Sequence, residues 1–279
     1  MDIANQGEKR RSPVANGLFY PDKAEILASR LADWGLAQGS NGGGQVIIAP
    51  HGAWDFAGSI AASAFAWAEQ QGKKTGRPVK RVLLLGTIHS SHEEGIYLSD
   101  SAFFETPLGD IKVDQELNRE LTSCSTLIRI NDIPHLSEHS LEILLPLVKY
   151  CFPHASIIPV LAAGQRPLLV SGLANAIKII FDDLFHESLI VISSNVSSNP
   201  EQSKALAMAV EFQSLLLGMD KEKILSALAG QRINACGAAL AASLLESELL
   251  RGRSFSAVCP LAQGIEEGEG TVYYGAYGA

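Results

Sequence analysis

The sequence predicts an α/β protein, with a single three-layer α/β/α domain built around a largely parallel or mixed central sheet. Several short segments, such as "QVIIAP" and "LIVISS", are apolar throughout rather than alternating, which is typical of strands covered on both faces. These segments alternate with helical segments, as in α/β folds. The 279 residues contain no internal repeat and no clear domain boundary. We expect residues 13–279 to form this domain, after a flexible arm over residues 1–12 whose "EKRR" is solvated.

The first half of the chain predicts helices and strands in alternation. The spacing of Ile26, Leu27, Leu31 and Trp34 indicates a helix over 21–39, and the glycine-rich stretch 39–44 is a linker. We then expect a strand over 45–50, a helix over 57–72, a strand over 80–88, and a turn and strand over 103–114.

The second half continues the alternation. A helix is predicted over 137–152, kinked at Pro146 because proline has no N–H to donate. It is followed by a strand over 155–164, a helix over 165–185 and a strand over 188–198. Helices are expected to fill most of 201–250, and "TVYYGAYGA" (271–279) is a closing strand.

Charge and cysteine content narrow the class of protein. With 22 basic and 30 acidic residues the net charge is −8, so a nucleic acid is not an expected partner. The chain has no apolar run of about 20 residues, and its polar start does not resemble a signal peptide. Its four cysteines are widely spaced and form no CxxC pair. We therefore expect a cytoplasmic protein without membrane attachment.

Polar residues follow three of the predicted strands, where open parallel sheets bind ligands. His51 follows "VIIAP", His89 follows "VLLLGTI", and Asn195 and Ser198 follow "LIVISS". Strands side by side lie about 5 Å apart, so the two histidines could bind one metal ion. The alternative is that each histidine is a structural residue with an ordinary hydrogen bond.

Cys236 in "NACGAAL" is the best candidate for a third ligand. We expect a helix to begin at Asn234 or Ala235, which places Cys236 in its first turn, where a thiolate is stabilised. Imidazole and thiolate ligands suit iron, copper or zinc. A small buried cysteine in the core is the alternative.

A further histidine, His139, lies in "SEHSLE" (137–142), at the start of a predicted helix. Its neutral form is favoured there, which suits a proton acceptor. Ser137, with Ser140 or Glu142, could instead make an ordinary helix cap. Four other histidines are expected at the surface, although one of them, His92, is close to His89 in the sequence: His92, His135, His154 and His186.

Taken in order, these stretches resemble the Memo-like family, whose bacterial and archaeal members are called AmmeMemoRadiSam system protein B. The resemblance covers nearly the whole chain. It rests on "ANGLFYP", "IIAPHGAWDFAGSIAASAF", "LLLGTIHSS", "TPLGDIKVD", "EHSLEILLPL", "IIPVLAAG", "LIVISSN", "NACGAAL" and "VYYGAYGA".

The resemblance implies a fold similar to that of the LigB-type class III extradiol dioxygenases, which use non-haem iron(II). By this comparison His51 and His89 match metal ligands, and Cys236 matches a cysteine of Memo proteins where the dioxygenases have a glutamate. His139 matches the acid/base histidine. The implied cofactor is Fe(II), with copper or zinc as alternatives. The implied protein partners are a radical SAM enzyme and an AMMECR protein of the same system.

The chain also departs from the family pattern. Asn195 and Ser198 stand where Memo proteins usually have an aspartate and a histidine, so two acid/base side chains of the pocket are absent. "HGAW" replaces the usual His-Ala-Gly-Tyr, and Ser90 replaces a second histidine. The three expected ligands are retained.

Three functions remain open from the sequence. The leading hypothesis is a non-haem metal-dependent oxidoreductase of unknown substrate, in which His139 moves a proton, Glu138 or Glu142 orients it, and Trp54 and Phe56 wall the pocket. The alternative is a binding or scaffold protein, with or without metal, that has lost catalysis. A zinc-dependent hydrolase is the third, although Ser193 and Ser194 are not in a G-x-S-x-G elbow.

Overall fold

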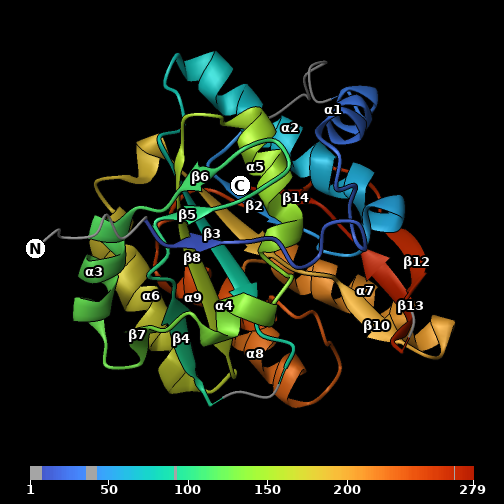
Figure 1. Cartoon of the computed structure of the whole chain (residues 1–279). Coiled ribbons are helices and arrows are strands. Elements are labelled where there is room, and N and C mark those ends of the chain that lie inside the picture. The colour runs from blue at the N-terminus through green and yellow to red at the C-terminus, as the bar shows by residue number, and fades with distance from the viewer. Residues whose placement is uncertain (1–7, 36–42, 91–92, 267) are drawn as a thin grey trace, which may run out of the picture.

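The computed structural model describes residues 8–35, 43–90, 93–266 and 268–279. Its main sheet has eight strands in the order β11-β14-β2-β9-β3-β8-β4-β7 (Figure 1). Within these described residues the sheet consists of β2 (Val46–Ala49), β3 (Arg81–Thr87), β4 (Gly95–Leu98), β7 (Ile128–Ile130), β8 (Ser156–Ala163), β9 (Ser188–Ser193), β11 (Ser256–Ala257) and β14 (Tyr277–Gly278).

The four central strands β2, β9, β3 and β8 are parallel, while β4 and β14 pair antiparallel with their inner neighbours. The expectation of a largely parallel or mixed sheet is thus confirmed. Parallel strands require crossovers, and helices supply them here. The helices are α1 (Ala24–Asp33), α2 (Ser59–Thr75), α3 (Gln115–Cys124), α4 (Ile133–Ser137), α5 (Leu145–Cys151), α6 (Pro167–Phe181), α7 (Gln202–Leu217), α8 (Lys221–Ala229) and α9 (Ala238–Glu246).

Both faces of the sheet are covered, and consecutive strand residues alternate between them. In β2, Ile47 packs in the cluster with α1, α2 and α5, whereas Ile48 packs in the cluster with α3, α6 and α9. Leu84 and Leu85 of β3 divide in the same way. Because both clusters are apolar, the strands are apolar throughout, which is the pattern that predicted the three-layer fold.

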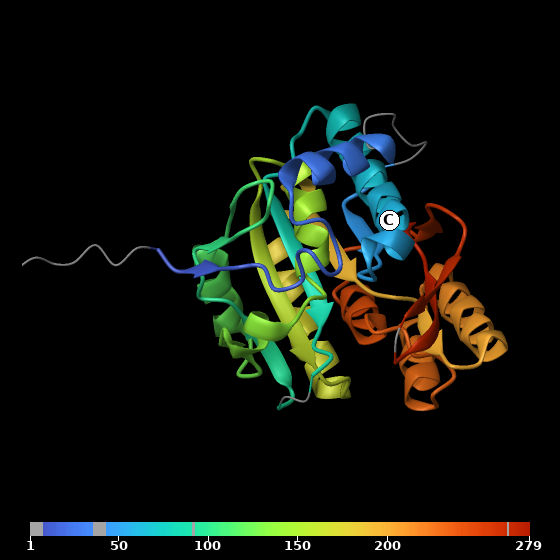
Figure 2. The ribbon, with the colours of Figure 1, turned by 45° about the vertical axis from the view of Figure 1, so that its right-hand side comes forward.

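Two small sheets flank the main one. The first contains β1 (Arg10–Arg11), β5 (Phe103–Phe104) and β6 (Ile111–Lys112). The second contains β10 (Ser197–Asn199), β12 (Ala262–Glu266) and β13 (Gly270–Tyr274). Figure 2 shows the second sheet with α7 and α8 at the right, beside the main sheet.

These small sheets correct three predictions. The strand expected over 188–198 ends at Ser193, and 197–199 pairs with β13 in the second sheet. The closing strand likewise divides into β13 and β14, which belong to different sheets. The arm is wrong from Arg10 onward, because Arg10–Arg11 pairs with β5 and Arg11 is buried. Residues 1–7 and most of the predicted linker 39–44 lie outside the described residues.

The helix expected over 137–152 is also wrong. The segment is divided into the end of α4, a loop through His139, a 3₁₀ turn (Glu142–Leu144) and α5. Pro146 lies in the first turn of α5, where its missing N–H is unneeded, so it helps to begin a helix rather than kink one.

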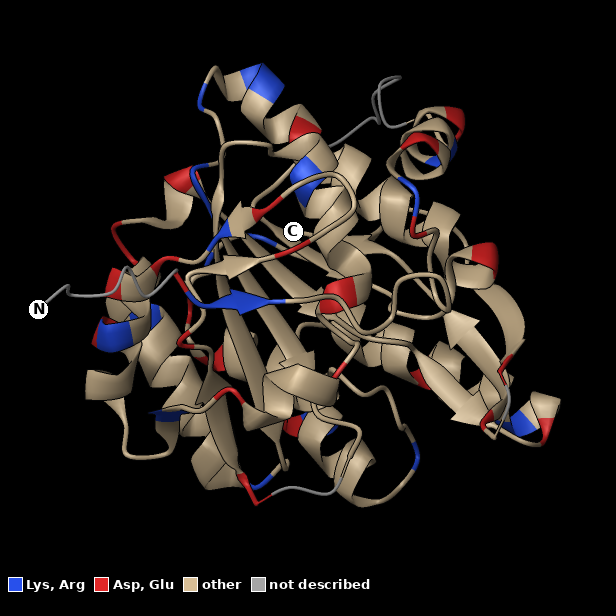
Figure 3. Cartoon of the chain, viewed as in Figure 1, with Lys and Arg blue, Asp and Glu red and all other residues tan. Residues whose placement is uncertain are grey.

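Charged residues are interspersed along the ribbon rather than segregated by sign (Figure 3). Among the described residues, no helix combines the length and apolar character needed to cross a membrane.

Candidate metal centre

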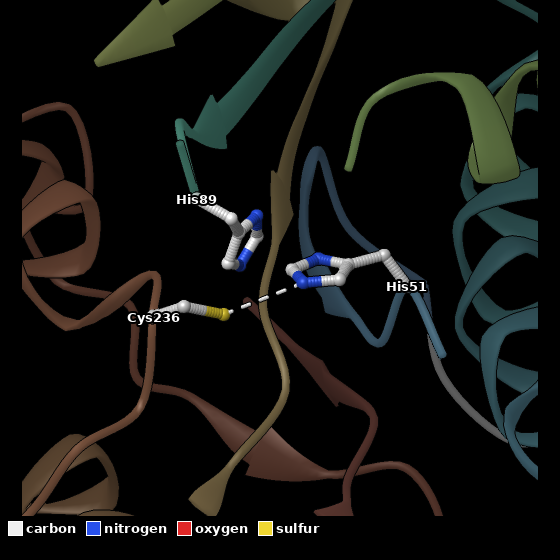
Figure 4. A group of neighbouring side chains, drawn as sticks. All are labelled: His51, His89 and Cys236. Carbon is white, nitrogen blue, oxygen red and sulfur yellow. Dashed lines mark hydrogen bonds between the residues drawn. The ribbon is translucent and has the colours of Figure 1, made fainter. Parts of the chain in front are cut away.

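Three side chains meet beyond the C-terminal ends of β2 and β3. His51 and His89 each lie two residues past their strand, and Cys236 lies two residues before α9. Their ligand atoms all lie within 4.8 Å of one another, and Cys236 Sγ is 3.6 Å from His51 Nε2. Figure 4 shows the three side chains pointing into a common space.

The strands β2 and β3 are not direct neighbours, because β9 lies between them. The expectation that the histidines extend from adjacent strands is therefore wrong. Each histidine lies two residues beyond its strand, and its side chain extends across the width of β9. The ring centroids of His51 and His89 therefore lie only 5.0 Å apart.

His51 is buried and held by two contacts. Its Nδ1 lies 2.8 Å from Ser193 Oγ, whose own hydrogen is donated to the Ser140 carbonyl over 2.6 Å. Ser193 Oγ therefore accepts a hydrogen bond from His51 Nδ1–H. In this tautomer the proton is on Nδ1, and Nε2 keeps a free lone pair. The backbone N–H of His51 donates to Asn195 Oδ1. The ring thus directs an acceptor nitrogen toward Cys236.

His89 is oriented by the buried carboxylate of Glu138. Its Nδ1 lies 3.0 Å and its backbone N–H 2.7 Å from the Glu138 oxygens. The same carboxylate accepts the backbone N–H groups of His139 and Ser140. Burial raises the pKa of Glu138, but the hydrogen bonds from His89 outweigh it and lower the pKa to about 2. This carboxylate–histidine arrangement is typical of metal-binding histidines and leaves Nε2 facing the centre.

The environment of Cys236 favours its thiolate form. Burial raises the pKa of its thiol, but the charges and hydrogen bonds of His51 and His89 hold it well below its usual range. Asn195 also donates its backbone N–H to Sγ over 3.2 Å. Burial lowers the pKa of His89, yet Cys236 and Glu138 overcome it and raise the pKa to about 10. The negative charges that favour a proton on the His89 imidazole would also favour a metal cation between this ring and the Cys236 sulfur.

The position of Cys236 differs from the prediction. The helix α9 begins at Ala238 with Gly237 as its N-cap, so Cys236 lies in the preceding turn rather than in the first helical turn. Thr87 fixes this turn by donating its hydroxyl to the Cys236 carbonyl over 2.7 Å. A Cβ on Gly237 would lie 2.6 Å from Ser194 Cβ, so only glycine fits between the turn and the sheet.

His139 lies in the loop between α4 and the 3₁₀ turn, stacked between two rings. Its ring centroid is 4.8 Å from that of Phe19 and 5.4 Å from that of His89. Burial is the main cause that lowers its pKa to about 4, so it is neutral at neutral pH. The predicted cause, a helix N-terminus, is wrong, because no helix begins at this position. His139 Nδ1 lies 3.5 Å from Glu138 Oε1.

The loop that carries Glu138 and His139 is fastened by a buried ion pair. Arg11 donates to the carbonyls of His135 and Glu138 and pairs with Glu142 over 2.5 Å. Glu142 also accepts the Tyr20 hydroxyl and two backbone N–H groups of the N-terminal segment. Glu142 is therefore engaged with Arg11 rather than with His139.

The other predicted residues are distributed over the fold. Trp54 is buried in the core beside Tyr20 and Trp34, and Phe56 is half exposed next to Gly264. Ser198 lies in β10, and its backbone N–H donates to Asn234.

The predicted surface positions of the other histidines are only partly correct. His154 and His186 are exposed, whereas the prediction for His135 is wrong, because it is buried and bonded to the Tyr97 carbonyl. His92 lies outside the described residues.

Sequence reasoning missed four residues that shape the centre: Ser193, Thr87, Phe19 and Arg11. Ser193 carries a weak signal, because it ends a predicted strand. The other three carry none, since their partners are distant in sequence.

Comparison with known proteins agrees with this architecture. A model of the family "Memo-like protein" matches residues 11–259. A MEMO1 family protein of Metallosphaera sedula is 28% identical over 198 residues, which are 67% of this chain and 68% of the relative. Another, from Thermotoga neapolitana, is 27% identical over 239 residues, covering 81% of this chain and 84% of the relative.

A solved structure is also similar in fold. The crystal structure of the uncharacterized protein JW3007 from Escherichia coli K12 aligns with a TM-score of 0.53 at 12% identity, covering 84% of this chain and 99% of that one. The family match is the more specific finding, because it follows the sequence through β2, β3 and the turn before α9. The chain therefore belongs to the Memo-like protein family.

Proposed function

We propose that His51, His89 and Cys236 bind one redox-active metal ion, and that the protein is a non-haem metal-dependent oxidoreductase. The observation that carries this proposal is the convergence of two imidazole nitrogens and the Cys236 sulfur within 4.8 Å, each histidine being held through its Nδ1. Nitrogen and sulfur donors suit iron, copper or zinc and disfavour magnesium or calcium. Iron(II) is our first candidate, with copper next.

Three protein ligands leave coordination positions open, which is typical of reactive rather than structural sites. A bound iron or copper ion would supply Lewis acidity and one-electron exchange. The protein residues supply the rest. Ser193 and Glu138 orient the two imidazoles, and the Asn195 N–H holds the thiolate in place.

His139 is the residue we assign to proton transfer. It lies against His89, and 31% of its side chain is exposed, so a bound substrate can reach the ring. Phe19 restricts the ring on its opposite face. Oxidation of a phenol or catechol is the version of the reaction that the family resemblance implies, with His139 accepting the hydroxyl proton.

A second candidate is a binding protein that presents this cleft to a protein partner, such as the radical SAM or AMMECR protein of the same system. Asn195 favours it, because its side-chain oxygen accepts the His51 N–H instead of supplying the acid/base group expected at this position. Ser198 likewise offers no titratable group. Such a protein would not depend on His139.

Metal content and turnover separate the two candidates. Untagged protein purified without oxygen is analysed by elemental mass spectrometry, beside His51→Ala and Cys236→Ala, with Cys259→Ala as a thiol control. We expect close to one iron or copper per chain, lost in the first two variants and kept in the control. Absence of metal, even after incubation with iron(II), copper(I) and zinc(II), would contradict the oxidoreductase.

For the metal-loaded protein, oxygen uptake with a catechol is compared between the wild type and His139→Ala. General acid–base residues contribute about 10²–10⁴-fold, so we expect at least a hundredfold loss at unchanged metal content. If metal-loaded His139→Ala takes up oxygen as fast as the wild type, the result supports the binding protein instead.

A further inference from the structure

A cleft of about 830 Å³ lies beside the turn that carries Cys236, and both Cys236 and Thr87 are among its lining residues. Its walls come from α7, from the end of α8 and from the segment 231–235 that leads to Cys236. This volume is within the range of small-molecule sites, about 300–1,000 Å³. A ligand in this cleft would therefore lie against Cys236, one of the three proposed metal ligands.

The lining of the cleft combines an apolar wall with unused polar groups. Met208, Leu228 and Ile233 supply the apolar part. Gln165 and Gln231 also line the cleft, and their side chains make no hydrogen bond to any described residue. Gln231 has φ 54° because it closes α8 in a Schellman motif, in which the Arg232 N–H donates to the Ala227 carbonyl over 2.9 Å.

The charges of the lining have the opposite sign to the chain as a whole. Lys204 and Arg232 are the cations and Glu211 is the one carboxylate among the lining residues, so the lining has a net charge of +1 in a chain of −8. Lys204 also pairs over 2.8 Å with the carboxylate of Glu201, which lies outside the lining. Glu211 accepts the Nε–H of Arg232 over 2.8 Å. Among the described residues the Nη groups of Arg232 make no hydrogen bond, and their planar edge suits an oxyanion.

We propose that this cleft binds the substrate and that the substrate carries an anionic group, which Arg232 and Lys204 bind. Arg232 is four residues from Cys236, so their Cα atoms are at most about 13–14 Å apart. The ligand is therefore a small acid whose reactive end lies at Cys236 while its anionic end lies at the cations. The two glutamines supply hydrogen bonds to its neutral middle. The reaction rests on the metal site proposed above, but binding of the anion does not.

The test uses the thiol of Cys236 as the reporter of charge in the cleft. Metal-free full-length protein is alkylated with anionic iodoacetate or with neutral iodoacetamide at equal ionic strength. Labelling of Cys236 is followed by peptide mass spectrometry. The ratio of the two rate constants measures how strongly the cleft attracts an anion, independently of the reactivity of the thiolate.

We expect Arg232→Gln and Lys204→Gln each to lower this ratio about threefold, and the double variant to lower it about tenfold, because nearby charges steer charged reagents. Glu211→Gln should raise the ratio, since it removes the carboxylate that competes for Arg232. Lys178→Gln is the matched control: its lysine also pairs with one carboxylate, Glu248, but lies near the end of α6 and is not part of the cleft lining.

An unchanged ratio in the double variant would overturn the proposal, as would an equal fall in Lys178→Gln. A Cys236 that reacts with neither reagent would overturn it as well, because the cleft would then not reach the sulfur. Since the protein is free of metal throughout, these outcomes are separate from the test of the metal site. Failure of one proposal does not imply failure of the other.

Discussion

Replacing Glu138 with glutamine tests whether His89 is held as a metal ligand. The Glu138 carboxylate accepts four N–H groups at 2.7–3.0 Å, two of them from His89, and it is almost fully buried. Glutamine keeps the size of the side chain but removes its negative charge. It also replaces one acceptor oxygen by an NH₂ group, which cannot accept a hydrogen bond from the N–H groups around it. We expect weaker metal binding in a protein that still folds.

The magnitude follows from the distance. Glu138 Oε1 lies 3.0 Å from His89 Nδ1. The ring and an Nε2–metal bond of about 2.1 Å place the ion roughly 6–7 Å from the carboxylate. A divalent ion beside one thiolate has net charge +1, and two unit charges at this distance interact by about 2.5 kcal/mol at an effective dielectric of about 20. That energy corresponds to about a sixtyfold loss of affinity, within the 10–100-fold range typical of such supporting residues.

The assay is a competitive titration of zinc(II) against a chromophoric chelator at pH 7. Glu187→Gln is the control, because Glu187 is also ion-paired but precedes β9 at the opposite end of the sheet. We expect the control to match the wild type. If Glu138→Gln also matches it within twofold while remaining folded, Glu138 does not support a metal ligand and our reasoning about His89 is refuted.

Three further outcomes are expected. Ser193→Ala removes the acceptor of His51 Nδ1 and should weaken zinc binding about tenfold in the same titration; an unchanged affinity would show that the tautomer needs no fixing. Arg11→Met leaves the buried Glu142 carboxylate without its counter-ion, so urea unfolding should show a loss of about 3–5 kcal/mol, partly recovered when Glu142→Gln is added; full stability of the single variant would contradict this. Burial lowers the pKa of His135 to about 4, so the unfolded chain takes up the proton first and stability is lost as the pH falls from about 6.5 to 4, by up to about 3 kcal/mol. His135→Gln should remove this part of the acid dependence of urea unfolding, and an unchanged slope would refute the assignment.

The fold was predictable where local pattern and burial agree. β2 and β3 are apolar on both faces because helices cover both, and this is visible in "VIIA" and "VLLLG". The same pattern fails after Ser193, because Ser197–Asn199 forms a strand only by pairing with β13, about 75 residues later. No local signal marks such a partner.

The candidate site was predictable to a similar degree. Strand ends indicated His51 and His89, since ligands bind there in parallel sheets. The order of the strands, with β9 between β2 and β3, could not be inferred from the sequence. Nor could the burial of Arg11, because a basic N-terminal run is ordinarily solvated and its partner Glu142 is 131 residues away.

The position of His139 shows how a residue can be indicated for the wrong reason. The apolar spacing after it predicted a helix, but the Glu138 carboxylate accepts the N–H groups of His139 and Ser140 and keeps the segment in a loop. The neutral imidazole is then a consequence of burial rather than of a helix dipole.

The most direct test of the central claim is a cobalt(II) titration followed by absorption spectroscopy. Cobalt bound by a thiolate gives an intense sulfur-to-metal charge-transfer band, and its visible bands report the coordination number. We predict saturation at one cobalt per chain with the charge-transfer band present, loss of that band in Cys236→Ser, and its retention in Cys259→Ser. Cobalt that binds without the band, or a band that survives in Cys236→Ser, would contradict a centre formed by His51, His89 and Cys236.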